Sequence, residues 1–291
     1  MEFVKGHGTE NDFVVLPDPD GELDLDGDAG TLVRALCHRR RGLGADGVLR
    51  VVRAGTPVAV SALAQAGVVP GDADWFMDYR NGDGSLAEMC GNGIRVFARY
   101  LVDAGLVAPG VHPIATRAGV RAVDVGRDGD VTVDMGPARL GPASVAVIGG
   151  REFPGIAVDV GNPHLACVLH DLDAADLDAL DLGPAPSYDA GLFPLGVNVE
   201  VLSPLVEGAV RLRVHERGSG ETRSCGTGTV AGAVAALRAA DREAGEVVVH
   251  TPGGRLVVGV TPDTTSLTGP AVLVARGEWG APVASLAGDA R

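Results

Sequence analysis

The clearest hydrophobic pattern in the sequence is a helical one that occurs twice. Apolar residues recur every three or four positions over residues 94–102 and again over residues 230–237, and this spacing places them on one helix face. Gly105 and Gly245 follow the two segments, so both helices are predicted to end there. The apolar positions are Ile94, Phe97, Ala98, Leu101 and Val102 in the first segment, and Val230, Ala233, Val234 and Leu237 in the second.

Short β-branched or alternating segments surround these two helices and predict strands. Two further helices are predicted at residues 31–40 and 171–182, and residues 54–74 are interpreted as an insertion in a hairpin without clear periodicity. Residues 136–142, rich in proline and glycine, are the predicted crossing between two halves. The predicted strands lie within residues 1–16 and at 48–52, 75–79, 120–125, 131–135, 156–160, 165–169, 197–202, 210–214, 246–250, 255–260 and 271–275.

One cysteine stands directly before each repeated helix. Cys90 begins the run CGNG and Cys225 the run CGTG. The start of a helix has unpaired N–H groups and the positive end of the helix dipole, which favour a thiolate and can also hold a carboxylate. The repeat therefore predicts two equivalent half-sites, each with one reactive thiol.

A second pair of polar residues follows the same spacing. Asn81 stands nine residues before Cys90, and Glu216 stands nine residues before Cys225. Both follow predicted strands. The two halves are therefore predicted to present equivalent positions that carry different polar groups.

Composition narrows the class of protein. The 291 residues are 46% hydrophobic with a net charge of −14, which indicates about two cored domains and argues against nucleic acid or an anionic membrane surface as a partner. No apolar run approaches the roughly 20 residues that span a bilayer, and the N-terminus lacks the pattern of a secretory signal. We expect a cytoplasmic protein acting on a small molecule, with a homodimer as one alternative for its oligomeric state.

The residue inventory also argues against cofactor chemistry. Lys5 is the only lysine and lies in a predicted strand, which is a poor position for a pyridoxal Schiff base. The four cysteines include no CxxC pair and have no histidine at zinc spacing, so neither a metal nor a cofactor is expected. Cys37 and Cys167 lie among apolar residues and are predicted to be packed in the core.

Two thiols on opposite sides of one carbon can invert its configuration without a cofactor. One thiolate removes the proton, and the other thiol delivers a proton to the opposite face. An amino-acid Cα–H is only weakly acidic, so the carbanion-like transition state needs strong stabilisation, which two helix N-termini near the α-carboxylate can supply. The two thiols must differ in protonation, and His164 and Glu216 are candidates to set that difference.

The sequence resembles the diaminopimelate epimerase family over nearly its whole length. Members of this family interconvert the LL and meso forms of diaminopimelate for lysine and peptidoglycan synthesis without a cofactor. Taken together and in this order the motifs are highly specific. They are HGTENDF (7–13), RGLGADG (41–47), RNGDGS (80–85), MCGNGIR (89–95), GNPH (161–164), GVNVE (196–200) and HERGSGETRSCGTGT (215–229).

The resemblance implies a fold and a set of site residues. The fold is α/β (α+β), with two pseudo-symmetric domains that each wrap a curved mixed sheet around a central helix. The domains span residues 1–134, with 266–291 returning to this half, and residues 135–265. The implied catalytic residues are Cys90, Cys225, His164 and Glu216. The implied substrate contacts are Asn11, Asn81, Gly91, Asn92, Asn162, Asn198, Glu216, Arg217, Gly226 and Thr227.

Two positions depart from the family pattern. Gly47 stands where some members carry a glutamine that contacts the substrate, so no ligand role is expected for it. Thr227 replaces a serine of other members and keeps both the hydroxyl and the backbone N–H.

Three alternatives remain open at this point. Proline racemases and hydroxyproline epimerases use the same two-thiol logic, but their first motif typically has a histidine where Asn92 stands. A non-catalytic anion-binding module could use the same glycine-rich helix starts, although it would not explain the paired thiols. A thiol-disulfide oxidoreductase would form a disulfide between Cys90 and Cys225. If the protein is an epimerase, the same disulfide is expected to inactivate it.

Overall fold

The computed structural model describes residues 1–25, 30–171 and 174–280, and the chain divides into two compact units. Unit 1 consists of residues 1–133 together with the chain from Pro270 onward, and unit 2 of residues 134–269. The halves expected from the sequence had their junctions at 134/135 and at 266. The expected loose tail, over the last dozen residues, lies outside the described residues from 281 onward.

In unit 1 a mixed sheet follows the order β17-β1-β2-β3-β4-β5-β6-β7. The β2/β3 and β4/β5 pairs are parallel, and the other neighbours are antiparallel. The strands are β1 (Glu2–Gly8), β2 (Asn11–Pro17), β3 (Gly47–Arg53), β4 (Trp75–Asn81), β5 (Gly110–Thr116), β6 (Gly119–Val125), β7 (Asp130–Gly136) and β17 (Val272–Glu278).

In unit 2 the strands follow the order β8-β9-β10-β11-β12-β14-β15-β16, with the short strand β13 paired to β12. Here β10/β11 and β12/β14 are the parallel pairs. The strands are β8 (Arg139–Ile148), β9 (Arg151–Asp159), β10 (Pro163–Val168), β11 (Asn198–Leu202), β12 (Ala209–Glu216), β13 (Gly220–Thr222), β14 (Gly245–Thr251), β15 (Gly254–Val260) and β16 (Thr265–Pro270).

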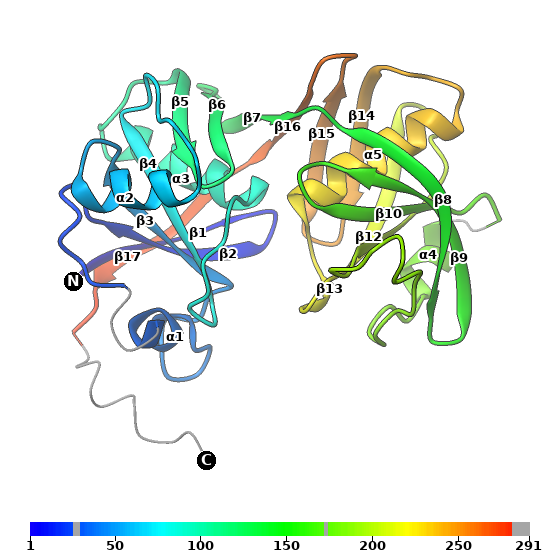
Figure 1. Ribbon diagram of the computed structural model, residues 1–291, viewed down its shortest axis with the longest axis horizontal. Coiled ribbons are helices and arrows are strands. Elements are labelled where there is room, and N and C mark those ends of the chain that lie inside the picture. Colours follow the sequence, from blue (N-terminus) through cyan, green and yellow to red (C-terminus); the bar gives the residue numbers. More distant parts are fainter. Residues whose placement is uncertain (26–29, 172–173, 281–291) are drawn as a thin grey trace. The chain divides into compact units, whose positions relative to one another are not determined.

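The two sheets are built on the same plan. The order of antiparallel and parallel neighbours from β1 to β7 is the same as from β9 through β12 and β14 to β16. Helix α3 (Gly91–Asp103) lies between β4 and β5 in the chain, and α5 (Gly226–Ala239) lies between β12 and β14. Figure 1 shows strands curving around each of these helices. The predicted fold class is therefore confirmed.

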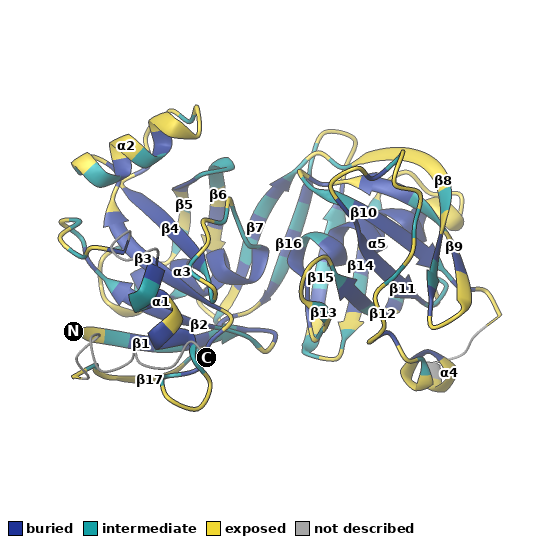
Figure 2. Ribbon diagram, turned by 60° about the horizontal axis from the view of Figure 1, so that its bottom comes forward, coloured by how far each residue is buried: buried dark blue, intermediate teal, exposed yellow. Residues whose placement is uncertain are grey.

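The central helices are largely buried within their units. Helix α3 packs on β1, β2, β3, β4, β6 and β17, and α5 packs on β9, β10, β11, β12, β14 and β15. Their residues are buried on almost all sides, as Figure 2 shows in dark blue. A helix enclosed by a sheet needs apolar or small residues all round, which explains the glycines and alanines of α5.

Three smaller helices lie outside the central ones. Helix α1 (Thr31–Cys37) ends earlier than predicted, because His38 already has an extended backbone. Helix α2 (Pro57–Gln65) lies in the segment interpreted as an insertion without periodicity, and this interpretation missed a helix. Thr56 caps α2 by accepting a hydrogen bond from Ala59 N at 3.4 Å, and a proline at the first helical position was the overlooked signal. Helix α4 (Ala174–Ala179) lies within the predicted segment 171–182.

The predicted helix ends were right in one unit and wrong in the other. Gly105 follows the C-cap of α3 with a φ of +69°, in the left-handed conformation that favours glycine. Helix α5 ends at Ala239, and Asp241 takes the left-handed conformation there with a φ of 55°. Gly245 instead begins β14.

Four strands were not predicted: β5, β8, β13 and β16. The first residues of β8, 139–142, had been expected as part of the crossing between halves. The proline and glycine content of these stretches hid their pairing, because single-sequence patterns do not show which backbone groups meet a neighbouring strand.

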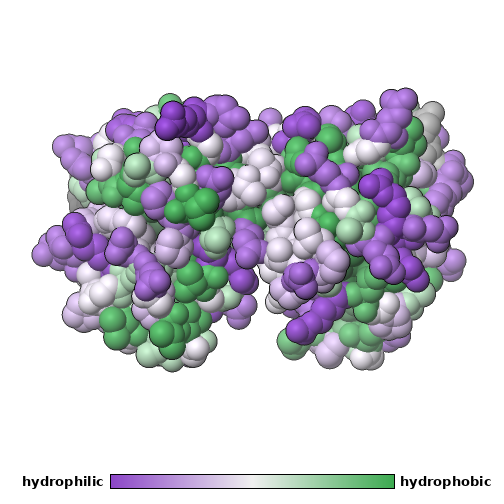
Figure 3. Space-filling model, turned by 90° about the horizontal axis from the view of Figure 1, so that it is seen from above, coloured by the Kyte–Doolittle hydropathy of each residue, from purple (hydrophilic) through white to green (hydrophobic). Residues whose placement is uncertain are grey.

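The surface is of mixed polarity. Hydrophilic side chains cover much of the face drawn in Figure 3, with hydrophobic ones between them. Within the described residues, no helix has the length and apolar character needed to cross a membrane.

Candidate active site

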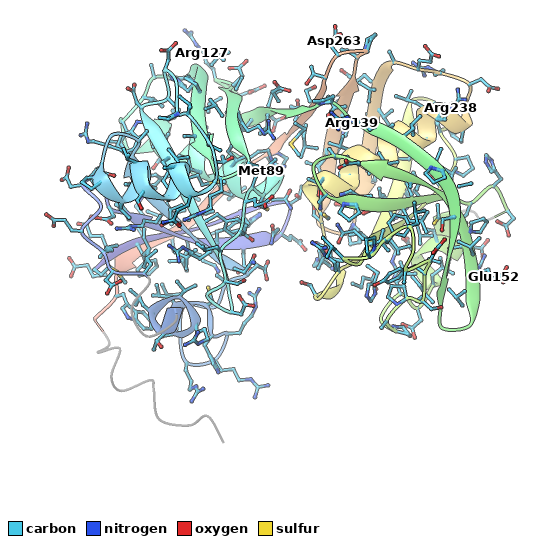
Figure 4. The ribbon with its side chains drawn as sticks, in the orientation of Figure 1. Met89, Arg127, Arg139, Glu152, Arg238 and Asp263 are labelled. Atoms are coloured by element: carbon cyan, nitrogen blue, oxygen red, sulfur yellow. The ribbon has the colours of Figure 1, made fainter. Side chains whose placement is uncertain are left out.

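Both repeated cysteines are the N-cap residues of the central helices. Cys90 Sγ accepts a hydrogen bond from Gly93 N at 3.4 Å, and Cys225 Sγ accepts one from Gly228 N at 3.4 Å. Both cysteines have an extended backbone, as N-cap residues do. Met89, labelled in Figure 4, immediately precedes Cys90. Each thiol therefore lies at the positive end of a buried helix, in contact with one of its unpaired N–H groups.

The residues predicted for the Cys90 half-site are Cys90, Asn11, Asn81, Gly91 and Asn92. Cys90 Sγ donates to Asn11 Oδ1 at 3.5 Å, and Asn92 Nδ2 donates to the same oxygen at 3.3 Å. Asn11 Nδ2 in turn donates to Asp46 Oδ2 at 2.7 Å. These bonds fix the Asn11 amide beside the thiol.

Asp46 belongs to a charged cluster that the sequence did not reveal. Arg39 bridges Asp46 and Asp12 at 2.6 and 2.8 Å, and Lys5 pairs with Asp12. Burial acts to raise the pKa of Asp12, but the hydrogen bonds from Arg39 and Lys5 outweigh it and lower the pKa to about 2. The only lysine of the sequence thus has a structural partner here.

A fully buried arginine lies under the Cys90 half-site. Arg95 is 0% exposed, and its guanidinium donates to Gly91 O and to Thr9 Oγ1, each at 3.1 Å. Thr9 Oγ1 in turn donates to Asn92 Oδ1 at 3.4 Å. Burial lowers the pKa of Arg95 to about 10, although the charge of Cys90 acts to raise it. Arg95 therefore holds the first turn of α3 and the hairpin before Asn11 together.

Asn81 is the last residue of β4. Its partner on the adjacent strand β3 is Gly47, where close packing leaves no room for a side chain. Asn81 Nδ2 donates to Ser85 Oγ at 3.0 Å. Gly47 pairs with Asn81 across β3 and β4. A Cβ added at Gly47 would lie 2.6 Å from Arg80 O, which no real structure tolerates without a backbone shift. The backbone of this chain thus excludes a glutamine at position 47 in its present conformation.

The residues predicted for the Cys225 half-site are Cys225, Asn162, His164, Asn198, Glu216, Arg217, Gly226 and Thr227. Burial raises the pKa of Cys225 well above its ordinary value, and the charges of Glu216 and Glu200 raise it further. Hydrogen bonds from Thr227, whose Oγ1 lies 3.6 Å from Sγ, and from Gly228 N oppose this rise. These causes favour the neutral thiol at Cys225.

Glu216 lies at the end of β12, in contact with Cys225. Burial raises its pKa, and the Glu200 charge adds to this, while hydrogen bonds with Thr222 and with Cys225 lower it. A carboxyl with a raised pKa beside a thiol can exchange a proton with it.

His164 lies beneath the start of α5 and forms a bond that the sequence analysis missed. Its Nδ1 lies 2.7 Å from Glu200 Oε1, and its Nε2 lies 3.0 Å from Asn162 Oδ1. His164 and Glu200 are both 0% exposed. In the sequence Glu200 is the last residue of the motif GVNVE. The available signal was a carboxylate flanked by valines in a strand, where charge is costly unless it has a partner.

Asn198 and Arg217 lie at the ends of neighbouring strands. Asn198 Oδ1 accepts from Arg217 N at 2.8 Å, and Arg217 Nη1 donates to Leu195 O at 2.6 Å. Arg217 is exposed, whereas Asn198 is buried. The amide therefore fixes the backbone at Arg217 and leaves that residue's side chain at the surface.

The strand registers relate the two half-sites residue by residue. Phe13 pairs with Gly47 in parallel strands of unit 1, as His164 pairs with Asn198 in unit 2. Leu49 stands two residues after Gly47, as Glu200 stands two after Asn198. The same backbone plan thus carries an apolar pair in unit 1 and a buried polar pair in unit 2.

The other two cysteines lie in the cores, as predicted. Cys37 and Cys167 are buried, and burial raises the pKa of both thiols, to about 12 for Cys37. Across residues 1–25, 30–171 and 174–280, no group of three or more His, Cys, Asp or Glu side chains could hold a metal ion.

Comparison with known proteins gives the family. The model of the family described as diaminopimelate epimerase matches residues 3–141 and 156–274. The chain belongs to the diaminopimelate epimerase family. It is 57% identical over 281 residues to the diaminopimelate epimerase of Rhodococcus opacus (95% of this chain, 96% of the relative), and 56% identical over 282 residues to that of Mycobacterium tuberculosis (96% of each).

Solved structures share the fold at low sequence identity. One is a hydroxyproline epimerase from Agrobacterium vitis with bound trans-4-hydroxy-L-proline, at a TM-score of 0.65 and 18% identity, covering 95% of this chain and 91% of that one. Another is a predicted epimerase from Pseudomonas aeruginosa, at a TM-score of 0.66 and 16% identity, covering 97% of this chain and 99% of that one. At these identities the likeness concerns the fold alone.

Proposed function

We propose that this member of the family interconverts LL- and meso-diaminopimelate, with Cys90 and Cys225 as the acid-base pair. The observation that carries the proposal is the repeated N-cap thiol. Each cysteine accepts a hydrogen bond from the third residue of a buried central helix at 3.4 Å. Family membership supports the substrate, and the reaction belongs to lysine and peptidoglycan precursor synthesis.

In the proposed reaction the two thiols act on opposite faces of one α-carbon. The thiolate takes the Cα proton and becomes a thiol, while the electron pair stays on the substrate as a carbanion stabilised by its carboxylate. The opposite thiol then gives its proton to the other face and becomes the thiolate. The reverse reaction exchanges the two roles, so no proton or electron is gained or lost.

The first turns of α3 and α5 are proposed to bind the α-carboxylate. Gly91, Asn92, Gly226 and Thr227 occupy these turns, where backbone N–H groups have no partner within the helix. Such donors stabilise the charge that develops in the transition state, and loss of one typically costs about 10² to 10³ in rate.

The remaining site residues are proposed to orient substrate and protons. His164 and Glu216 set the protonation of Cys225, which Glu216 contacts directly. The proposed substrate contacts are Asn11, Asn81, Asn162, Asn198 and Arg217. Glu216 is proposed to contact the substrate as well. Asn81 and Glu216 occupy equivalent strand ends, so their different polarity would distinguish the two ends of the substrate.

We place the reaction in the cytoplasm, with a free small molecule as partner and with neither nucleic acid nor a membrane. The net charge of −14 argues against nucleic acid and an anionic membrane surface as partners. A homodimer remains one alternative, and light scattering coupled to size-exclusion chromatography decides it.

An isotope-exchange assay tests the function. The protein is incubated in D₂O with LL-diaminopimelate or, separately, with L-proline, and deuterium at Cα is measured by mass spectrometry. We expect exchange and inversion of diaminopimelate alone. Exchange of proline alone would show a proline racemase instead.

Cysteine variants test the two-thiol mechanism in the same assay. Cys90→Ser and Cys225→Ser are each expected to lower inversion by about 10² to 10⁴-fold, as loss of a general acid or base does. Cys37→Ser is the matched control, because Cys37 is a buried thiol in a core. A Cys225→Ser protein with undiminished inversion would exclude the mechanism.

A further inference from the structure

Glu200 is a buried carboxylate in the middle of an apolar strand. Its neighbours Val199 and Val201 on β11 are buried, and Glu200 itself is 0% exposed. A buried charge is unfavourable unless it is paired and hydrogen-bonded. Its hydrogen-bond partner is His164, whose Nδ1 lies 2.7 Å from Oε1, and among the described residues Oε2 has no hydrogen-bond partner.

The equivalent position in unit 1 shows that the fold does not need this pair. Leu49 and Phe13 lie under Gly93 at the start of α3. A Cβ built on that glycine would lie 3.2 Å from Leu49 Cδ2 and 3.4 Å from Phe13 Cζ. In unit 2 Glu200 Oε1 lies 2.5 Å from a Cβ built on Gly228. The same space under the first helical turn therefore holds hydrocarbon in one unit and a carboxylate in the other.

The hydrogen-bond geometry indicates how Glu200 acts. Both ring nitrogens of His164 lie against oxygens, Nδ1 against Glu200 and Nε2 against Asn162 Oδ1 at 3.0 Å. Each nitrogen that meets an oxygen donates a hydrogen. Both nitrogens donate in an imidazolium, and that form of the ring would neutralise the buried carboxylate and hold the Asn162 amide in one orientation.

Asn11 in unit 1 is equivalent to Asn162 in unit 2. Asn11 stands two residues before Phe13, and Asn162 stands two residues before His164. Its amide is oriented directly by an acid, since Nδ2 donates to Asp46 Oδ2 at 2.7 Å. The two units thus orient equivalent amides by different routes. In unit 2 the route runs from Glu200 through His164 to Asn162.

We propose that Glu200 is a positioning residue that holds His164 as an imidazolium and, through it, orients the Asn162 amide in the Cys225 half-site. This inference rests on the proposed function, because it assigns Glu200 a part in binding and proton transfer at that half-site. The Glu200 charge also acts on the neighbouring acids, since it raises the pKa of Cys225 and of Glu216.

Nitrogen NMR of histidine tests the first step without any turnover. In protein labelled with ¹⁵N-histidine, the signal that is lost in His164→Phe belongs to His164. At neutral pH we expect hydrogens on both nitrogens of His164 in the wild type, and on one nitrogen in Glu200→Gln. Glu152→Gln is the control, because Glu152 is exposed on β9 (Figure 4). A neutral His164 in the wild type, or an unchanged signal in Glu200→Gln, overturns the inference.

A double variant separates positioning from packing. Glu200→Leu alone leaves His164 buried without its acid, and thermal stability is expected to fall. His164→Phe combined with Glu200→Leu reproduces the Phe13 and Leu49 pair of unit 1, so stability is expected to recover. Because orientation of Asn162 is lost in both proteins, kcat is expected to stay on the order of 10²-fold lower. Recovery of kcat together with stability would show a packing role only.

Different results contradict the proposed function and the role of Glu200. If the wild-type protein exchanges no Cα hydrogen of diaminopimelate, the proposed function is wrong, yet the NMR measurement still decides the protonation of His164. If the wild type turns over normally and Glu200→Gln keeps the wild-type kcat and KM, the function stands and Glu200 has no positioning role.

Discussion

Alanine at the third residue of each central helix gives a matched test of the buried acid pair. Gly93 and Gly228 occupy equivalent positions, and each donates its backbone N–H to the capping thiol at 3.4 Å. Alanine keeps that N–H and gains about 1 kcal/mol of helix propensity over glycine. The two substitutions therefore differ only in what the new Cβ meets.

At Gly228 the new Cβ would lie 2.5 Å from Glu200 Oε1. The carboxylate must withdraw by roughly 0.9 Å to reach ordinary contact, which breaks the 2.7 Å bond to His164. Loss of a hydrogen bond between charged groups costs about 1.5–3 kcal/mol. After the gain in helix propensity, Gly228→Ala is expected to destabilise unit 2 by about 0.5–2 kcal/mol.

At Gly93 the new Cβ would lie 3.2 Å from Leu49 Cδ2, the far end of a flexible side chain. A shift of a few tenths of an ångström relieves this contact without breaking a hydrogen bond. Gly93→Ala is therefore expected to be neutral or to stabilise unit 1 by up to about 1 kcal/mol.

Hydrogen-exchange mass spectrometry measures the two effects separately, through peptides from α3 and α5. Tryptophan fluorescence would miss the effect of Gly228→Ala in unit 2, because Trp75 and Trp279 both belong to unit 1. We also expect inversion of diaminopimelate to fall in Gly228→Ala and to persist in Gly93→Ala. Equal protection of α5 in the wild type and in Gly228→Ala would refute the argument that the carboxylate is held rigidly under this turn.

Three further substitutions test other parts of the structure. Asp12→Asn should lower stability at pH 7 by at most about 2 kcal/mol, since Arg39 holds the Asp12 pKa at about 2 instead of 3.8. The depressed pKa of Asp12 stabilises the folded state above pH 3.8, and this contribution is lost as the pH falls towards 2. The difference in unfolding free energy between variant and wild type, measured in urea, should therefore close over that range. A constant difference would contradict this. Thr56→Ala removes the cap of α2 and should cost about 1 kcal/mol locally, seen as faster exchange in residues 57–65 with no change in α3. Gly47→Gln should lower the melting temperature without improving KM, because its Cβ would meet Arg80 O at 2.6 Å; an unchanged melting temperature would show that the backbone yields.

Much of the candidate site could be predicted because it is local in the chain. A cysteine before a glycine-rich helical segment becomes an N-cap whatever surrounds it, and both thiols were placed correctly at helix starts. The equal spacing of Asn81 and Glu216 before their cysteines corresponds to equivalent strand ends. Helix α2 could have been found in the same way, from a threonine followed by proline.

Residues that act through distant partners could not be predicted in this way. Glu200 became visible only through its bond to His164, which is 36 positions away in the chain. The Asn11 amide lies beside Cys90 because β2 runs under α3, a contact 79 positions apart. No periodicity or motif encodes such pairs.

The sequence by itself determined the repeated helices, the N-cap thiols and the family resemblance, because these depend on short spacings and on local backbone chemistry. Only the tertiary structure decided what lies beneath each thiol. Strand register places Phe13 and Leu49 under one helix start, and Glu200 with its partner His164 at the equivalent strand positions in the other unit, with Glu200 under the helix start. Burial then gives the second pair its effect, since a charge removed from water acts strongly on its neighbours.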